Sequence, residues 1–218
     1  MNVLRFPGDS PGVTTSDLLL WPQAGILDRL VTALQAARCD FTVLNQSIRI
    51  STEQPDALVG LLLSTLSAEE QQTTRALLKA DDTLPGLEDF ARVVSLDAAI
   101  GVLQRGWLLR IIEEDRLESW LQPIVSAADP WTIIAHEALL RARRPDGGLI
   151  FPDQLFSAAR RAGLLDVLDH AAQLAAIRTA GQHRLPGELF INFSPVFVHR
   201  PQAFISRILT AVADAGLS

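Results

Sequence analysis

The spacing of apolar side chains changes along the chain, and it predicts helices in some segments and strands in others. Between residues 24 and 38, and again between residues 96 and 111, apolar residues recur every three or four positions, which places them on one face of a helix. Between residues 41 and 52 they alternate with polar ones, which is typical of a short strand. The second helix is predicted to span residues 96–115 and to connect an N-terminal region to the rest of the chain.

The remainder of the N-terminal region, residues 16–95, carries signals for the starts of further helices. Pro55 suits the first turn of a helix, because proline has no N–H to lose there. Ser67 and Glu70 form a capping-box pattern, and we expect that helix to run to about Lys79. With one short strand among these helices, the region is predicted to be mostly helical, with a regulatory or packing role.

After residue 116 the pattern changes to strands that alternate with helices. Apolar runs of strand length occur at residues 120–125, 132–142 and 188–194. Helices are predicted at residues 152–162, 165–180 and 201–216, with proline or glycine near their ends. This order of elements is typical of an α/β domain with parallel strands.

Composition narrows the class of protein. Hydrophobic residues make up 48% of the 218 residues and charged residues 20%, so a folded chain is expected rather than a disordered one. The net charge of −6 argues against binding to DNA or RNA. No apolar run is long enough to span a membrane, and Cys39 is the single cysteine. Residues 1–15 are predicted to be a flexible leader without a signal-peptide core, and a cytoplasmic location is expected.

Four short motifs follow one another in the C-terminal half. They are QPIV at 122–125, HEALLR at 136–141, RPDGG at 144–148 and INFSP at 191–195. Between the last two motifs lie GLL at 163–165 and the pair Leu168 and Asp169. In order and spacing, the four motifs resemble the EAL domain of bacterial cyclic-di-GMP phosphodiesterases, over about residues 105–218. The tripeptide EAL alone would be weak evidence, but four motifs in register are specific.

The resemblance implies a fold and a reaction. The expected fold is α/β: an incomplete TIM-like (β/α) barrel of the EAL type over residues 116–218, with its first strand antiparallel to the others. Domains of this family hydrolyse cyclic di-GMP to linear pGpG and use Mg²⁺ or Mn²⁺. Barrel enzymes carry their sites at the carboxyl ends of the strands, where the late positions of Glu137, Arg141 and Asn192 should bring them together.

The resemblance also assigns roles to individual residues. It implies that Glu137 and Asn192 are metal ligands, which fits the preference of hard cations for carboxylate and amide oxygens. It implies that Arg141 contacts the dinucleotide, and Arg141 lies four residues after Glu137, on the same side of a strand. Leu139 shares that face and would line the pocket, and Gln122 matches a position near the ligand.

Other residues that the family uses are not found in residues 1–218. Members bring further acidic metal ligands from later strands, followed by a lysine and another glutamate. Two ligands do not define a two-metal centre, so we expect a fragment of an EAL domain that is inactive by itself. Two functions stay open: a phosphodiesterase in its complete form, or a catalytically silent scaffold that acts by interaction. The expected partners are cyclic di-GMP and either a second copy of the chain or the rest of the barrel.

Overall fold

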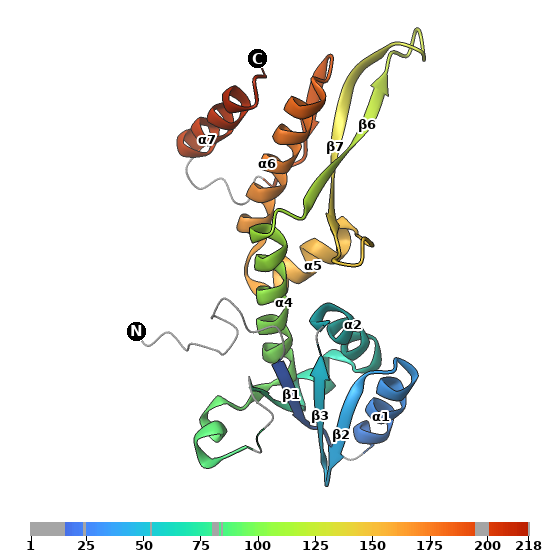
Figure 1. Cartoon of the computed structure of the whole chain (residues 1–218), viewed down its shortest axis with the longest axis vertical. Helices are drawn as coiled ribbons and strands as arrows, with labels where there is room; N and C mark the ends of the chain where they lie inside the picture. The colour runs from blue at the N-terminus through green and yellow to red at the C-terminus, as the bar shows by residue number, and fades with distance from the viewer. Residues whose placement is uncertain are drawn as a thin grey trace. The chain divides into compact units, whose positions relative to one another are not determined.

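The computed structural model describes residues 16–217 apart from 24, 53, 80–82, 84 and 195–200. The predicted leader, residues 1–15, therefore lies outside the described residues. The chain forms two compact units that divide between Trp107 and Leu108 (Figure 1). None of the helices in the described part of the chain is long and apolar enough to cross a membrane.

The N-terminal unit is built on a five-stranded sheet in the order β2-β3-β1-β4-β5, and every neighbouring pair is antiparallel. Its strands are β1 (Ser16–Trp21), β2 (Asp40–Leu44), β3 (Ser47–Thr52), β4 (Arg75–Lys79) and β5 (Val94–Ser95). Its helices are α1 (Ile26–Ala36), α2 (Pro55–Thr65), α3 (Ala68–Thr73) and the 3₁₀ helix η2 (Leu87–Arg92). The path β1-α1-β2-β3-α2-β4 with this strand order is a split β-α-β, or ferredoxin-like, arrangement.

One apolar cluster holds this unit together. Alternate residues of the central strands β1 and β3 point to the same face of the sheet, where Leu20 and Ile50 are fully buried. Helices α1 and α2 cover that face with their own apolar stripes, which include Leu34 and Leu62. The apolar residues of α1, which recur every three or four positions, therefore form the face of the helix that is buried.

The prediction that residues 16–95 contain one short strand among helices is wrong, because the described residues form five strands as well as helices. The capping box at Ser67 is present, because the Glu70 N–H donates to the Ser67 hydroxyl and the Ser67 N–H donates to the Glu70 carboxylate. The helix that it opens ends at Thr73, however, and Arg75–Lys79 is a strand rather than the last helical turns. This short apolar run pairs with β1 and β5, and successive residues that point to opposite faces are buried, so it has no period that separates a strand from a helix.

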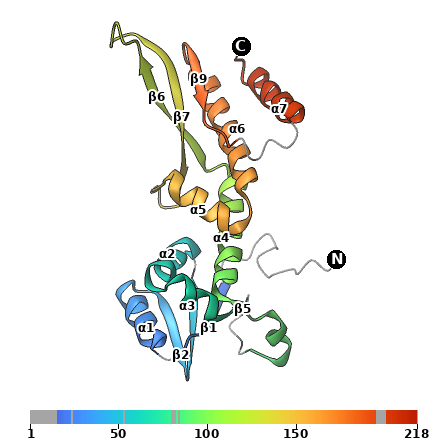
Figure 2. The same ribbon diagram turned by 180° about the vertical axis from the view of Figure 1, so that it is seen from behind.

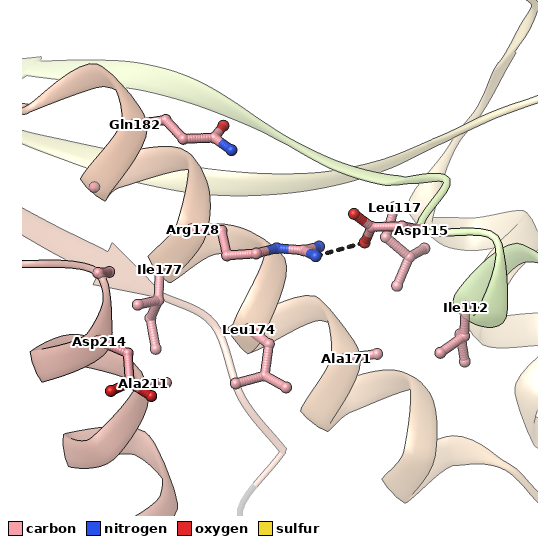
Figure 3. A pocket seen from close by; sticks show the side chains of 12 residues that line it. Ile112, Asp115, Leu117, Ala171, Leu174, Ile177, Arg178, Gln182, Ala211 and Asp214 are labelled. Carbon is pink, nitrogen blue, oxygen red and sulfur yellow. Dashed lines mark ion pairs between the residues drawn. The ribbon is translucent and has the colours of Figure 1, made fainter.

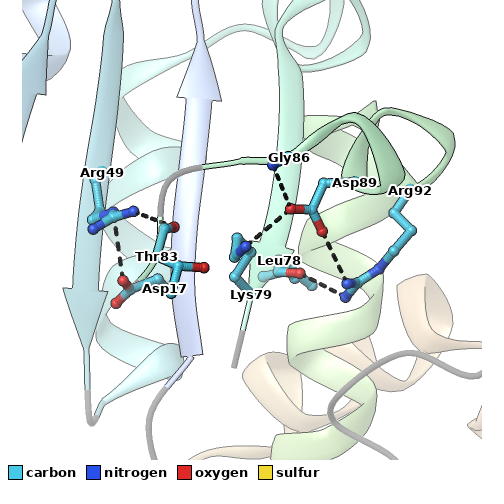
Figure 4. Close-up of polar contacts among 8 residues, drawn as sticks. All are labelled: Asp17, Arg49, Leu78, Lys79, Thr83, Gly86, Asp89 and Arg92. Carbon is cyan, nitrogen blue, oxygen red and sulfur yellow. Dashed lines mark hydrogen bonds and ion pairs between the residues drawn. The ribbon is translucent and has the colours of Figure 1, made fainter. Parts of the chain in front are cut away.

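Charged side chains join Gly86 and η2 to the end of β4, as Figure 4 shows. The Lys79 ammonium lies 2.9 Å from the Asp89 carboxylate, and both side chains are buried. The Gly86 N–H donates to the same carboxylate at 3.0 Å, and Arg92 pairs with it at 3.3 Å. These contacts, the Lys79 hydrogen bond first, lower the pKa of Asp89 below its ordinary value. On a neighbouring strand Arg49 pairs with Asp17.

The C-terminal unit carries a second sheet of four strands (Figure 2). Helix α4 (Leu96–Glu113) spans the division between the units, and the strands are β6 (Leu117–Val125), β7 (Ile133–Arg143), β8 (Leu149–Ile150) and β9 (Glu188–Ile191). The helices that follow α4 are α5 (Pro152–Ala162), α6 (Leu165–His183) and α7 (Pro201–Asp214). Strand β7 pairs antiparallel with β6 and β8, and parallel with β9.

This unit follows the predicted order of strands and helices, and β6 is antiparallel to β7 as the resemblance implies. The sheet is open at both edges, so the architecture is mixed α/β and a closed barrel is not formed by the described strands. Helix α6 packs on one face of the sheet, and Leu168 and Ile177 of α6 are buried, as is Ala138 of β7. The opposite face keeps large apolar side chains exposed, including Trp120 and Phe190.

Candidate functional site

The motif residues of β6 and β7 share the sheet face that α6 does not cover. On β7 the buried positions His136, Ala138 and Ala142 alternate with the more exposed Glu137, Leu139 and Arg141. The strand register places Gln122 of β6 directly opposite Glu137, and Trp120 opposite Leu139. Alternation along two paired strands therefore gathers four of the five predicted site residues on one face: Gln122, Glu137, Leu139 and Arg141.

The fifth, Asn192, meets Glu137 from the neighbouring strand. The Asn192 Nδ2 group donates a hydrogen bond of 2.8 Å to Glu137 Oε1, although the residues are 55 positions apart in sequence. Parallel pairing of β7 with β9 causes this approach, because Ala138 stands opposite Ile191 and Asn192 follows it directly. The two side chains thus converge as their strand positions predict. Pro195, the last residue of the fourth motif, lies outside the described residues.

Arg141 is held between two aromatic rings. Its guanidinium carbon lies 5.4 Å from the centroid of the Trp120 ring and 5.3 Å from that of Phe151, distances typical of cation–π contacts. Its Nη1 donates to the Leu140 carbonyl at 2.7 Å, whereas its Nε is buried and has no hydrogen-bond partner among the described residues. The rings are about half exposed, at 46% for Trp120 and 49% for Phe151. The two rings therefore restrict the position of the guanidinium.

Sequence reasoning missed this aromatic pair. Trp120 stands two residues before Gln122, so the two-residue period of a strand already places both on one face. Phe151 has no such signal, because it follows the short strand β8 and its position depends on the path of the chain through the RPDGG turn. In that turn the Gly148 N–H donates to the Asp146 carboxylate, and Gly147 has a φ of 87°, which favours glycine.

A bidentate ion pair borders the same region. Arg143 donates to Glu118 through Nε and also through Nη2, the latter at 2.8 Å. This pairing is the first cause that lowers the pKa of Glu118 below its ordinary value. The Nη1 of Arg143 donates to the Gly147 carbonyl, so the ion pair ties β6 to the RPDGG turn. Sequence reasoning did not single out this pair.

Comparison with known proteins accounts for the motifs. The family model of the EAL domain matches residues 105–218, which is more than half of the chain. The chain belongs to the EAL family. Its similarity to the cyclic di-GMP phosphodiesterase NbdA of Pseudomonas aeruginosa is 31% identity over 135 residues, which cover 59% of this chain and 17% of NbdA.

Among solved structures, the EAL segment is similar to the FimX EAL domain from Pseudomonas aeruginosa bound to c-di-GMP. The identity is 25% over 51% of this chain and 44% of that one, with a TM-score of 0.43. The PaMucR phosphodiesterase in complex with c-di-GMP is 26% identical over 50% of this chain and 45% of that one, with a TM-score of 0.42. The chain thus spans less than a fifth of NbdA and less than half of these two structures.

The candidate oxygen ligands of the EAL segment are of the type that a hard cation prefers, but they are few. Glu137 and Asn192 offer a carboxylate and an amide, the oxygen ligands that Mg²⁺ and Mn²⁺ prefer. The hydrogen bond between them uses the amide nitrogen and one carboxylate oxygen, and leaves the amide oxygen out of the contact. Within the described ranges, no group of three or more histidine, cysteine, aspartate or glutamate side chains lies close enough to hold a metal.

A separate cavity lies on the helical side of the EAL segment (Figure 3). Its volume is about 600 Å³, and its lining is mainly apolar, with Leu117 of β6 and Leu174 and Ile177 of α6. The Arg178 guanidinium and the Asp115 carboxylate, which also line it, pair at 2.6 Å. None of the five predicted site residues lines this cavity, so it is distinct from the sheet face that carries the motifs.

Proposed function

We propose that this chain carries part of a cyclic-di-GMP phosphodiesterase site, with Glu137 and Asn192 as oxygen ligands of Mg²⁺ or Mn²⁺. The observation that supports the proposal best is the 2.8 Å hydrogen bond between these two side chains, which holds both proposed metal ligands at one place on the sheet. It agrees with the EAL family match over residues 105–218. In this proposal the open sheet over residues 116–218 is part of a TIM-like barrel.

The proposed roles follow from the chemistry of a phosphodiester. A divalent cation, when bound, neutralises phosphate charge and lowers the pKa of a bound water. Among the residues of this chain, Glu137 offers the carboxylate, and the Asn192 N–H orients it. Gln122, opposite Glu137 in the strand register, would contact the ligand near the same point. Leu139 would line the pocket on the same face.

Arg141 is the proposed phosphate contact. Stacking between Trp120 and Phe151 limits its rotamers, so less side-chain entropy is lost when a phosphate binds. A guanidinium can donate N–H hydrogen bonds to the oxygens of one phosphate. Cyclic di-GMP presents two such phosphates as well as two bases that can contact the exposed rings.

A polypeptide of residues 1–218 is proposed to lack hydrolytic activity by itself. Each hard cation takes about six oxygen ligands, whereas the proposed site offers one carboxylate and one amide. Residues 16–95 would then be a regulatory or packing domain, and residues 96–115 a connecting helix that leads into the EAL segment. The site would be completed by further barrel strands or by a second copy of the chain.

A catalytically silent scaffold is the second candidate function. The small number of donors in the described residues favours it, because a site of two ligands suits ligand recognition better than two-metal catalysis. In this case the chain would act through protein contacts, and cyclic di-GMP binding would be regulatory or absent.

Titration of residues 1–218 with cyclic di-GMP, with and without Mn²⁺, tests the proposal. We expect binding that Mn²⁺ strengthens, loss of that strengthening in Glu137→Gln and Asn192→Ala, and no formation of pGpG. The matched control is Glu188→Gln, since Glu188 is an exposed acid of β9 outside the motifs. Binding that Glu137→Gln leaves unchanged would refute the assigned site, and no binding by any variant would favour the scaffold.

A further inference from the structure

Asp169 is a buried carboxylate of α6 that contacts the backbone just beyond β9. Only 7% of the residue is exposed. Gln173, one helical turn further along α6, donates from Nε2 to Asp169 Oδ2 at 2.9 Å. The Ser194 N–H donates to both carboxylate oxygens, at 3.2 and 3.4 Å. The carboxylate therefore joins α6 to a residue 25 positions away in sequence.

This contact lies two residues from Asn192. Strand β9 has four residues and its pairing with β7 ends at Ile191, so Asn192 stands just outside the ladder. Asn192 in turn donates to Glu137 on β7. A continuous series of hydrogen bonds therefore runs from Gln173 through Asp169 to Ser194, and Ser194 is linked by two peptide units to the Asn192–Glu137 pair.

We propose that Asp169 is a positioning residue, which fixes the segment after β9 so that Asn192 reaches Glu137. The inference rests on the proposed function for the importance of that pair. It does not require Asp169 to touch the ligand or a cation. Asp169 belongs to the Leu168-Asp169 pair that accompanies the motifs in the sequence, and this contact gives it a role that packing alone does not supply.

The cost of burying the carboxylate supports a specific role. Burial raises the pKa of Asp169 above its ordinary value, and the Ser194 hydrogen bond and the neighbouring His170 only partly oppose this. An apolar side chain would fill the same position on α6 without that cost, as Leu168 does beside it. What an apolar side chain lacks is an acceptor for the Ser194 N–H, and an unpaired N–H there would cost free energy.

Three substitutions separate positioning from packing. Asp169→Ala removes the acceptor. Asp169→Asn keeps it, because the amide oxygen can accept from Ser194. Its amide nitrogen can donate to Gln173 Oε1 once the Gln173 amide turns over, and that oxygen is buried with no partner among the described residues of the wild type. Gln173→Leu is the matched control, since it changes the same buried pair but leaves the Ser194 contact. All three are made in residues 1–218 with nitrogen-15 labelling.

The readouts are the side-chain amide signal of Asn192 and the hydrogen exchange of the Ser194 amide. In Asp169→Ala we expect the Asn192 signal to shift and Ser194 exchange to accelerate by about tenfold, which corresponds to one typical hydrogen bond. Asp169→Asn should restore both, and Gln173→Leu should leave both near wild type. An Asn192 signal that stays unchanged in folded Asp169→Ala would overturn the inference.

A second variant covers the case in which Asp169→Ala does not fold. Ser194→Pro removes the donor and leaves the core of α6 intact, and it should produce the same shift of the Asn192 signal. No shift in Ser194→Pro would also overturn the inference. Titration with Mn²⁺ then separates the two proposals. If Mn²⁺ fails to broaden the wild-type Asn192 signal, the proposed cation site is wrong. If Mn²⁺ broadens that signal equally in wild type and in Asp169→Ala, the proposed positioning role of Asp169 is wrong.

Discussion

The two units differ in how their sheets are covered and in how each pairs a buried acid. In the N-terminal unit, two helices cover one face of the sheet, and the buried acid Asp89 is matched by Lys79 and Arg92. In the C-terminal unit, the described residues leave one sheet face uncovered, and the buried acid Asp169 is paired with amide donors. The unit whose contacts are incomplete is the one that carries the EAL motifs. The exposed sheet face of the C-terminal unit is therefore the candidate binding face. Each prediction below tests this contrast between the units.

The largest expected effect concerns apolar packing. Leu20 of β1 is fully buried, so Leu20→Ala should lower the free energy of unfolding by about 2–5 kcal/mol. Phe190 of β9 lies on the open sheet face and is 51% exposed, and Phe190→Ala should change this free energy by no more than about 0.5 kcal/mol. Urea denaturation followed by circular dichroism measures both. Equal losses would mean that the open sheet face is covered in solution.

The next effect concerns binding at that open face. Arg141→Ala should weaken cyclic-di-GMP binding by about 1.5–3 kcal/mol, the usual contribution of hydrogen bonds to a charged group. Trp120→Ala should weaken it by about 0.5–1 kcal/mol, because the guanidinium then loses its contact with one ring. Trp131→Ala is the matched control, as Trp131 is 93% exposed at the far end of the β6–β7 hairpin. A larger loss for Trp120 than for Arg141 would assign the main contact to the ring.

The sequence was most informative where one local pattern determined the outcome. The stripe of residues 96–111 became α4, and strand alternation placed Glu137, Leu139 and Arg141 on one face. The prediction of a helix failed at Arg75–Lys79, because a short apolar run in a central strand has no period that distinguishes it from a helix. The unassigned run Ser16–Trp21, which became β1, has the same ambiguity.

For the candidate site, the motifs identified residues but not their supports. Asn192 and Glu137 follow from the parallel pairing of two strands, which the alternation of elements already implies. The contacts of Arg141 with Phe151 and of Asp169 with Ser194 depend on how separate elements pack. Tertiary packing of this kind leaves no fixed spacing in the sequence, so only the structure shows it.

The smallest expected effect concerns the two buried acids, whose pKa values shift in opposite directions from the ordinary 3.8. The pKa of Asp89 is lowered, chiefly by its hydrogen bond with Lys79, so its ionised form binds the folded state better. Its stabilising contribution is complete above pH 3.8 and is lost as the pH falls through the lowered value. The pKa of Asp169 is raised by burial, so its contribution is complete below pH 3.8 and is lost as the pH rises through the raised value.

Neutral substitutions at the two acids should therefore act in opposite ways. Asp89→Asn should destabilise the N-terminal unit at neutral pH and flatten its stability loss in acid, because Lys79 and Arg92 then face an uncharged partner. Asp169→Asn should leave the C-terminal unit as stable as wild type or slightly more stable at neutral pH, because it removes a charge that burial disfavours. Hydrogen exchange of peptides from each unit between pH 3 and pH 8, corrected for intrinsic rates, reports both effects. If Asp169→Asn destabilises its unit as strongly as Asp89→Asn does, the ionised carboxylate of Asp169 must have a cationic partner in solution, and the contrast between the two acids is wrong.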